Sequence, residues 1–310
     1  MKMRDLITIV LSIYFTTSIY AQTIYSKKYG HPENEPLIFL HGGPGYNSIS
    51  FEVSTAQKLA DAGFYVIVYD RRGEGRSKDI SANFNFEESF ADLDAIYDKF
   101  DIQKANIIGH SFGGIIGTLY AEDNPKKVKS IILMSTPVSI QETFSTIIRT
   151  SKQIYKKNED SINLKYIKML NNMDKTSLEF ASYSFGHAML NNFYTPKQPS
   201  DSAKHIYDKL NRNKTYQEGK TMTTQPTYGF WKNEAYTTIN LINHLKNLKT
   251  NYIRIYGLYG QEDGLFSKKQ IKSIQKLIPQ QNFRHYKDCS HNVFIDQQKL
   301  FISALKNWLQ

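Results

Sequence analysis

The feature that most constrains the fold is Gly109-His110-Ser111-Phe112-Gly113-Gly114, which lies between two segments of different character. Residues 105–108 are an apolar run that favours a buried strand, and residues 112–122 favour a helix. A Gly-x-Ser-x-Gly sequence between a strand and a helix is typical of a nucleophile elbow, a tight turn that exposes the serine hydroxyl. We therefore expect Ser111 to be a nucleophile. The alternative is an ordinary turn whose serine caps the helix.

Short apolar runs and amphipathic segments alternate through much of the chain. This pattern is typical of α/β proteins with a mostly parallel central sheet and helices on both faces. The expected strands are 37–40, 64–69, 105–108, 130–134, 252–256 and 282–286. The expected helices are 55–62, 86–100, 112–122, 268–277 and 297–309.

The alternation stops between residues 137 and 249, where Lys, Asn, Thr and Tyr are frequent and β-branched runs are few. Residues 144–154 and 162–170 favour helices, while prolines in 194–198 and 225–228 are expected to break them. We interpret the whole stretch as a mostly helical insertion that covers the sheet edge. The predicted organisation is a signal peptide at 1–21, a core domain of 22–136 and 250–310, and a cap of 137–249.

A nucleophilic serine needs a histidine base and an acid that orients the histidine, in the chain order serine, acid, histidine. Asp263 follows the expected strand 252–256 in a glycine-containing loop, and it is our candidate for the acid. Its neighbour Glu262 is the alternative. His291 follows the last expected strand and precedes the terminal helix, so we expect it to be the base. The other histidines lie on the elbow, in a strand, in the insertion or early in the chain.

The segment His41-Gly42-Gly43-Pro44-Gly45 follows the expected strand 37–40. Attack by a serine places negative charge on a carbonyl oxygen, and backbone N–H groups arranged in advance stabilise that charge. One donor is expected to be the N–H of Phe112, after the nucleophile, and the second comes from a glycine-rich loop such as this one. We predict Gly43 as the second donor and expect His41 to fix the loop by hydrogen bonds. A tight turn without a chemical role is the alternative.

These motifs carry a family resemblance. Together with residues 70–77 (DRRGEGRS), the HGGPG segment, the elbow, Asp263 and His291 make the chain resemble the α/β-hydrolase family of prolyl iminopeptidases and related serine aminopeptidases, from about residue 24 to the end. The resemblance implies an α/β-hydrolase fold and removal of an N-terminal residue, often proline, from short peptides through an acyl-enzyme. Family members commonly have Gln at the position of Arg71 and Trp at that of Phe112, so contacts near the nucleophile are expected to differ.

An enzyme that acts on peptide N-termini must also bind a protonated amine, and a buried cation needs a carboxylate partner. The resemblance implies that such acids lie in the cap. Glu234 is our candidate for the amine site, and Trp231 or Phe230 is expected to line the pocket for an apolar side chain. Asp208 and Glu179 are the alternatives.

The net charge of +10 raises the question of an anionic partner. The lysines are scattered, and the longest clusters, such as Lys126-Lys127 and Lys156-Lys157, are only pairs, which indicates a solvated basic surface and no nucleic-acid partner. No His and carboxylate cluster has metal-ligand spacing, and no phosphate-binding glycine motif is present. We expect neither a metal nor a cofactor.

Residues 1–21 are typical of an export signal, because Lys2 and Arg4 precede an apolar stretch at 6–15 that is too short to span a bilayer. Ala21 is a plausible cleavage point, although Ile19 leaves an uncleaved anchor as the alternative. The sequence therefore predicts a periplasmic or secreted protein without stable membrane insertion after cleavage. The only cysteine, Cys289, cannot form an internal disulfide and is expected to be a buried, inert thiol.

The leading interpretation is a secreted serine hydrolase, and first of all an aminopeptidase acting on small peptides. An esterase or other acyl hydrolase with the same triad is the first alternative, because a fold and its nucleophile do not determine the leaving group. The second is a binding protein without catalytic activity. The presence of all three expected triad residues argues against that last possibility.

Overall fold

The computed structural model describes residues 24–310, so the expected export signal lies outside the described residues. A seven-stranded sheet in the order β1-β3-β2-β4-β5-β6-β7 forms the centre. Only β1 is antiparallel to its neighbour, so the expectation of a mostly parallel sheet is confirmed. The strands are β1 (Ser26–Tyr29), β2 (Glu35–Leu40), β3 (Phe64–Tyr69), β4 (Ala105–His110), β5 (Val128–Met134), β6 (Arg254–Gly260) and β7 (Phe283–Tyr286).

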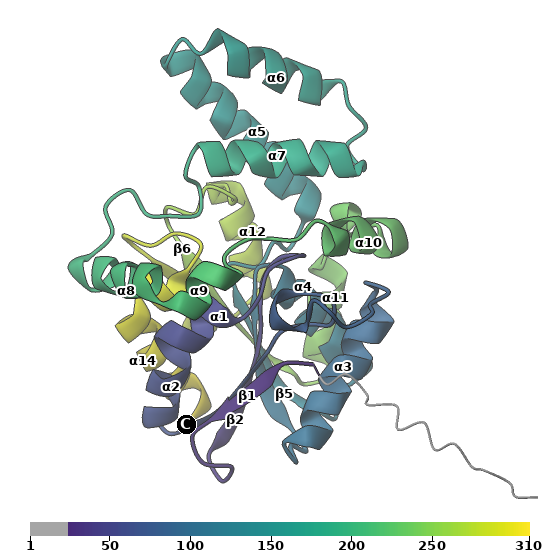
Figure 1. Cartoon of the computed structure of the whole chain (residues 1–310), viewed down its shortest axis with the longest axis vertical. Helices are drawn as coiled ribbons and strands as arrows, with labels where there is room; N and C mark the ends of the chain where they lie inside the picture. The colour runs from purple at the N-terminus through teal and green to yellow at the C-terminus, as the bar shows by residue number, and fades with distance from the viewer. Residues whose placement is uncertain (1–23) are drawn as a thin grey trace, which may run out of the picture.

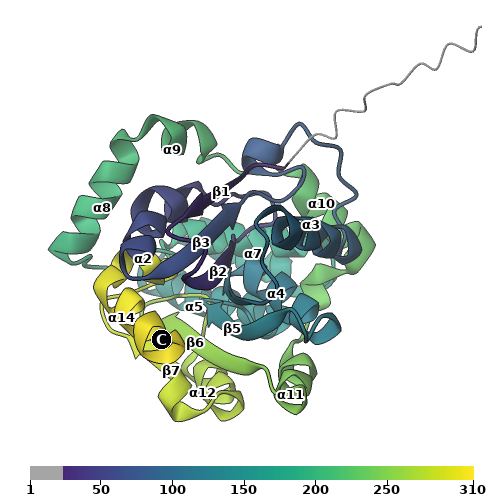
Figure 2. The ribbon, with the colours of Figure 1, turned by 90° about the horizontal axis from the view of Figure 1, so that it is seen from below.

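Helices cover both faces of this sheet, and Figure 2 shows α3 and α4 on one side with α2 and α14 on the other. Alternate strand residues divide between two buried clusters: Ile107 packs with the helices of the first side, and its neighbour Ile108 packs with those of the second. The helices of the core are α1 (Ile49–Phe51), a π-helical turn (Glu52–Ala56), α2 (Gln57–Asp61), α3 (Phe86–Lys99), α4 (Phe112–Asp123), α12 (Lys268–Leu277), α13 (Val293–Asp296) and α14 (Gln298–Leu309).

The chain between β5 and β6 is mostly helical. It contains α5 (Ile140–Lys157), α6 (Ser161–Asn171), α7 (Leu178–Leu190), α8 (Asp201–Arg212), α9 (Lys214–Gly219), α10 (Gln225–Glu234) and α11 (Ile242–Thr250). In Figure 1, α5, α6 and α7 stand at one end of the molecule, whereas Leu245 and Leu248 of α11 belong to the same buried cluster as α4. The proposed limits of the cap and core domains stay a prediction.

One local expectation about this stretch is wrong. The proline within residues 225–228 is expected to break a helix, but α10 begins at Gln225 and holds Pro226 in its first turn. Proline is tolerated there because the first N–H groups of a helix have no partner within the helix. No helix among residues 24–310 is both long and apolar enough to cross a membrane.

The sheet order places two loops side by side. The chain passes from β2 to β3 on one side and then returns to β4 on the other side of β2. The loops that leave β2 and β4 therefore diverge from adjacent strand ends, which is where α/β sheets bind their ligands. Leu40 is paired with Gly109, so residues 41–45 begin beside the turn that holds Ser111.

Candidate active site

Ser111 occupies a strained turn between β4 and α4. Its backbone has φ +51° and ψ −121°, a conformation that costs free energy for any residue with a side chain. The turn is tight because the flanking glycines have no room: a Cβ added at Gly109 would collide with the backbone of Gly114, and one added at Gly113 would collide with the carbonyl oxygen of Leu40. The sequence therefore forms an elbow that leaves the Ser111 side chain only half-buried.

The expected base and acid are hydrogen-bonded to each other. Asp263 lies in the loop after β6 and His291 in the loop after β7, and the distance between His291 Nδ1 and Asp263 Oδ2 is 2.8 Å. The other carboxylate oxygen of Asp263 accepts the N–H of Leu265. Glu262, the alternative acid, instead accepts the backbone N–H of Lys197. The structure thus pairs His291 with Asp263, and both side chains are buried.

His110 connects this pair to the elbow. Its Nε2 lies 3.1 Å from the carbonyl oxygen of His291, and the two imidazole rings are 5.0 Å apart between centroids. Burial lowers the pKa of His110 to about 3, so the ring is neutral and its Nε2–H donates to that oxygen. Within residues 24–310 the hydroxyl of Ser111 makes no hydrogen bond, to His291 or to any other group. Ser111 and the Asp263–His291 pair therefore lie in loops at the same end of the sheet and are connected through His110, without a direct hydrogen bond between serine and histidine.

A buried ion pair holds the HGGPG loop against the elbow. Arg71 donates to the carbonyl oxygens of His41 and Gly42 at 2.6 and 2.8 Å. Glu74 pairs with Arg71 at 2.8 Å and accepts the N–H of Gly45 at 2.7 Å. The sequence pointed to Arg71 only as a departure from the family, and it gave no sign of the role of Glu74. Together the two side chains fix both ends of the loop.

His41 completes this network as a neutral ring. Its Nδ1–H donates to the carbonyl oxygen of Gly42 at 2.8 Å, and its Nε2 accepts the backbone N–H of Arg71 at 3.1 Å. Burial lowers the pKa of His41 well below its usual value, which keeps the ring in this neutral form. His41 therefore has the hydrogen-bonding role in the loop that we expected.

The two expected oxyanion donors have no acceptor within the described part of the chain. Phe112 opens α4, where the first N–H groups of a helix have no partner in the helix and the helix dipole favours negative charge. Gly43 has φ +127°, which glycine adopts without strain, and a Cβ added at Gly42 beside it would lie 3.2 Å from the Cβ of Ser111. Neither amide is therefore used by another group of the described chain.

Two side chains near His291 were not predicted from the sequence. Tyr194 packs edge-on against the His291 ring, with centroids 5.1 Å apart. Asp296 accepts the N–H of Ser290 at 2.8 Å and the hydroxyl of Tyr207 at 2.7 Å, and its burial raises the pKa to about 6. Asp296 therefore ties the loop of His291 to α8. No local pattern marks these residues, because the contacts of Tyr194 with His291 and of Tyr207 with Asp296 depend on how distant segments pack.

The residues expected to bind the amine do not contact the triad. Glu234 accepts the N–H of Phe86 at 2.6 Å, and Trp231 donates its ring N–H to the carbonyl oxygen of Thr176 at 2.9 Å. No hydrogen bond or ring contact joins either one to Ser111 or His291 in residues 24–310. The alternatives Asp208 and Glu179 are exposed.

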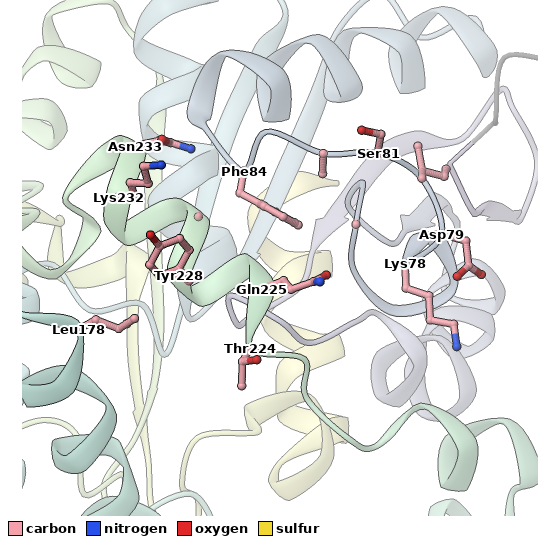
Figure 3. Close-up of a pocket in the computed structure, with 14 residues that line it drawn as sticks. Lys78, Asp79, Ser81, Phe84, Leu178, Thr224, Gln225, Tyr228, Lys232 and Asn233 are labelled. Carbon is pink, nitrogen blue, oxygen red and sulfur yellow. The ribbon is translucent and has the colours of Figure 1, made fainter.

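A cavity of about 790 Å³ lies elsewhere, between residues 78–84 and α10 (Figure 3). Phe84, Gln225 and Tyr228 line it, and no residue of the triad does. We therefore place the candidate active site at the elbow, where the groups needed for chemistry converge. Among residues 24–310, no group of three or more His, Cys, Asp or Glu side chains is arranged to hold a metal ion.

Comparison with known proteins agrees with this fold. Residues 35–298 match the family described as alpha/beta hydrolase fold. The proline iminopeptidase of Lactobacillus helveticus is 25% identical over 282 residues, which cover 89% of this chain and 90% of that protein. The rhodomycin D methylesterase DnrP of Streptomyces peucetius is 33% identical over 115 residues, 36% of this chain and 38% of that one.

Among solved structures, a proline iminopeptidase-related protein from Thermus thermophilus superposes with a TM-score of 0.65 at 17% identity, covering 92% of this chain and 94% of that one. The expected fold is therefore confirmed. The chain belongs to the α/β-hydrolase fold family and is similar to its proline iminopeptidases.

Proposed function

We propose that this protein is a serine aminopeptidase that releases an N-terminal residue, proline or another, from short peptides. The observation that carries the proposal is the convergence of the elbow, the HGGPG loop and the Asp263–His291 pair at one end of the sheet. The peptidase specificity is supported by the similarity to proline iminopeptidases along 89% of the chain.

In the proposed mechanism, the hydroxyl of Ser111 attacks the carbonyl carbon of the first residue while Nε2 of His291 takes the proton. Asp263 holds the Nδ1–H and stabilises the imidazolium. The amides of Gly43 and Phe112 donate to the oxyanion. His291 then protonates the leaving amine, and a water activated by the same ring hydrolyses the acyl-enzyme. The serine–histidine contact forms with substrate bound, as is common for catalytic hydrogen bonds.

A fluorophosphonate probe tests the nucleophile directly. The wild-type protein is expected to be labelled, and Ser111→Ala is expected to lose both the label and hydrolysis. An intact fold in the variant, shown by circular dichroism, keeps the comparison valid. A folded wild-type protein that takes no label would contradict the proposal and favour a binding protein without catalysis.

An esterase is the second candidate, favoured by the stretch of similarity to the methylesterase. The two candidate functions are distinguished by comparing kcat/KM for prolyl p-nitroanilide with kcat/KM for p-nitrophenyl acyl esters, both measured on one preparation of the protein. N-blocked prolyl p-nitroanilide is the control, since an aminopeptidase requires the free amine. Turnover of the esters without turnover of the prolyl p-nitroanilide would contradict the peptidase assignment, and it would still agree with a serine hydrolase.

The same substrates test the amine site. If Glu234 binds the amine, Glu234→Gln raises KM for the free-amine substrate and leaves ester turnover unchanged. Because Glu234 also accepts the N–H of Phe86, thermal unfolding must first show that the variant is folded. Equal effects on both substrates would point to a structural role instead.

We also propose that the protein is exported and then cleaved after Ala21. The basic start and short apolar stretch of residues 1–21 support this. Cell fractionation followed by N-terminal sequencing tests it, with Gln22 expected as the first residue of the exported form.

A further inference from the structure

The arm formed by α5, α6 and α7 stands away from the central sheet (Figure 1). Within this arm α6 buries Ile167 and Leu170. Its outer side carries Ile162, Tyr166 and Met169, which are 65%, 51% and 60% exposed. These three residues follow the spacing i, i+4, i+7, so they form one continuous apolar stripe along the helix.

The clustering of exposed apolar side chains on this arm is unusual for a soluble surface. Six of the ten large apolar side chains that are exposed within residues 24–310 lie on α6 and α7. Apolar residues scattered singly over a surface need no explanation, whereas a cluster indicates a contact surface. The charges around the cluster indicate which kind of partner fits it.

Positive charge borders the stripe. Lys165 lies three residues after Ile162 and four before Met169, so it neighbours both on the helix surface. Lys168 follows on the same helix, and the last turns of α5 add Lys152, Lys156 and Lys157, all exposed. Residues 150–175 hold six lysines against three acidic residues. The arm thus combines apolar and basic groups on its exposed surface.

We propose that the outer face of α6 docks on the surface of a membrane rich in anionic lipid. Apolar side chains enter the headgroup region while lysines pair with lipid phosphates, which is how amphipathic surface helices bind. A second copy of the chain fits less well, because it would bring lysines against lysines. A stable protein interface also buries about 800 Å² per partner, more than one stripe on a helix about 16 Å long offers.

Vesicle sedimentation tests this proposal with the full chain. Wild-type protein is expected to bind vesicles of phosphatidylglycerol and phosphatidylcholine at low salt, and to bind pure phosphatidylcholine vesicles at least tenfold more weakly. Tyr166→Ser/Met169→Ser and Lys165→Gln/Lys168→Gln should each reduce the affinity for anionic vesicles at least tenfold. Any affinity contributed by residues 1–23 is shared by every variant, so the differences report on α6.

The matched control is Lys268→Gln/Lys269→Gln, which removes the same charge from exposed positions on α12. It should bind anionic vesicles within twofold of wild type, and thermal unfolding should show all variants folded. Equal binding by all variants would overturn the proposal. Self-association that the α6 variants abolish, without vesicle binding, would also overturn it and assign the stripe to a second copy of the chain.

Discussion

At the scale of single residues, the HGGPG loop depends on a charge pair that water does not reach. Arg71 is 3% exposed and Glu74 is fully buried. Such a pair adds little net stability compared with apolar residues, but removing one partner leaves the other charge unpaired in the interior. In this protein the pair sets the shape of the loop, because the guanidinium binds the carbonyl oxygens of His41 and Gly42 and the carboxylate binds the amide of Gly45.

This pair yields a prediction about stability. Arg71→Gln leaves Glu74 buried without its charge partner and should lower the free energy of unfolding by about 3 kcal/mol. The double variant Arg71→Gln/Glu74→Gln removes both charges and should recover part of that loss. Urea unfolding of the two variants and wild type measures the difference. A double variant less stable than Arg71→Gln would show that the pair does not act as a unit.

The conformation of Ser111 yields a second prediction. A side chain at φ +51° and ψ −121° carries backbone strain of about 1–3 kcal/mol, which glycine relieves. Glycine also adds flexibility to the unfolded chain, which opposes folding by about 0.5–1 kcal/mol. Ser111→Gly should therefore be about 1 kcal/mol more stable than Ser111→Ala in thermal unfolding. Both variants lack the hydroxyl, so a glycine variant that is less stable than the alanine variant by about 0.5–1 kcal/mol would mean that the turn is unstrained.

Much of the candidate site could be predicted from the sequence because its loops follow strands. Asp263 and His291 were identified from their positions after β6 and β7, and the parallel sheet brings those loops to one end. Tyr194 and Asp296 could not be identified in this way. The contact of Tyr194 with His291 arises from the path of the insertion over the core. Asp296 contacts Ser290 within the turn that leads into α13, and no sequence motif marks that turn.

At the scale of elements, helices and strands with a clear apolar pattern could be predicted from the sequence, whereas elements without such a pattern were missed. The strand β3 and the helix α12 have the predicted bounds, since both show a clear apolar pattern. The strand β1 was missed because its residues Ser26–Tyr29 are polar and half-exposed, and it forms through pairing with β3. The helices α8 and α9 were missed as well, in a stretch rich in lysine and asparagine.

The contact between α4 and β2 yields a prediction about glycine. A Cβ at Gly113 would overlap the carbonyl oxygen of Leu40, so Gly113→Ala should destabilise the fold by at least about 2 kcal/mol. The matched control is Gly186→Ala in the middle of α7, where nothing lies within 4 Å of the new methyl group. That change should stabilise the protein by about 0.5–1 kcal/mol, because alanine favours helices. Opposite signs in urea unfolding are the expected result.

At the scale of the whole molecule, the fold buries two histidines that must stay neutral. Burial lowers the pKa of His41 well below its usual value and that of His110 to about 3. At pH 5 the unfolded chain therefore holds protons on these rings that the folded protein does not. Each neutral ring contributes its full share of the folding free energy above a pH of about 6.5, the pKa of histidine in the unfolded chain. This contribution is lost as the pH falls toward the pKa of the ring in the folded protein. Asp296 acts in the opposite direction, since its raised pKa favours the folded state as the pH falls through about 6.

Replacing His110 isolates one of these contributions. Between pH 7 and pH 5 the wild-type protein should lose about 2 kcal/mol of stability through this ring, whereas His110→Asn loses nothing at this position. The difference in unfolding free energy between the two proteins should therefore shift by about 2 kcal/mol in favour of the variant, while Asp296 contributes equally to both. A constant difference between His110→Asn and wild type would mean that His110 takes up a proton in the folded protein, and it would contradict the assignment of a neutral His110 ring that donates to the carbonyl oxygen of His291.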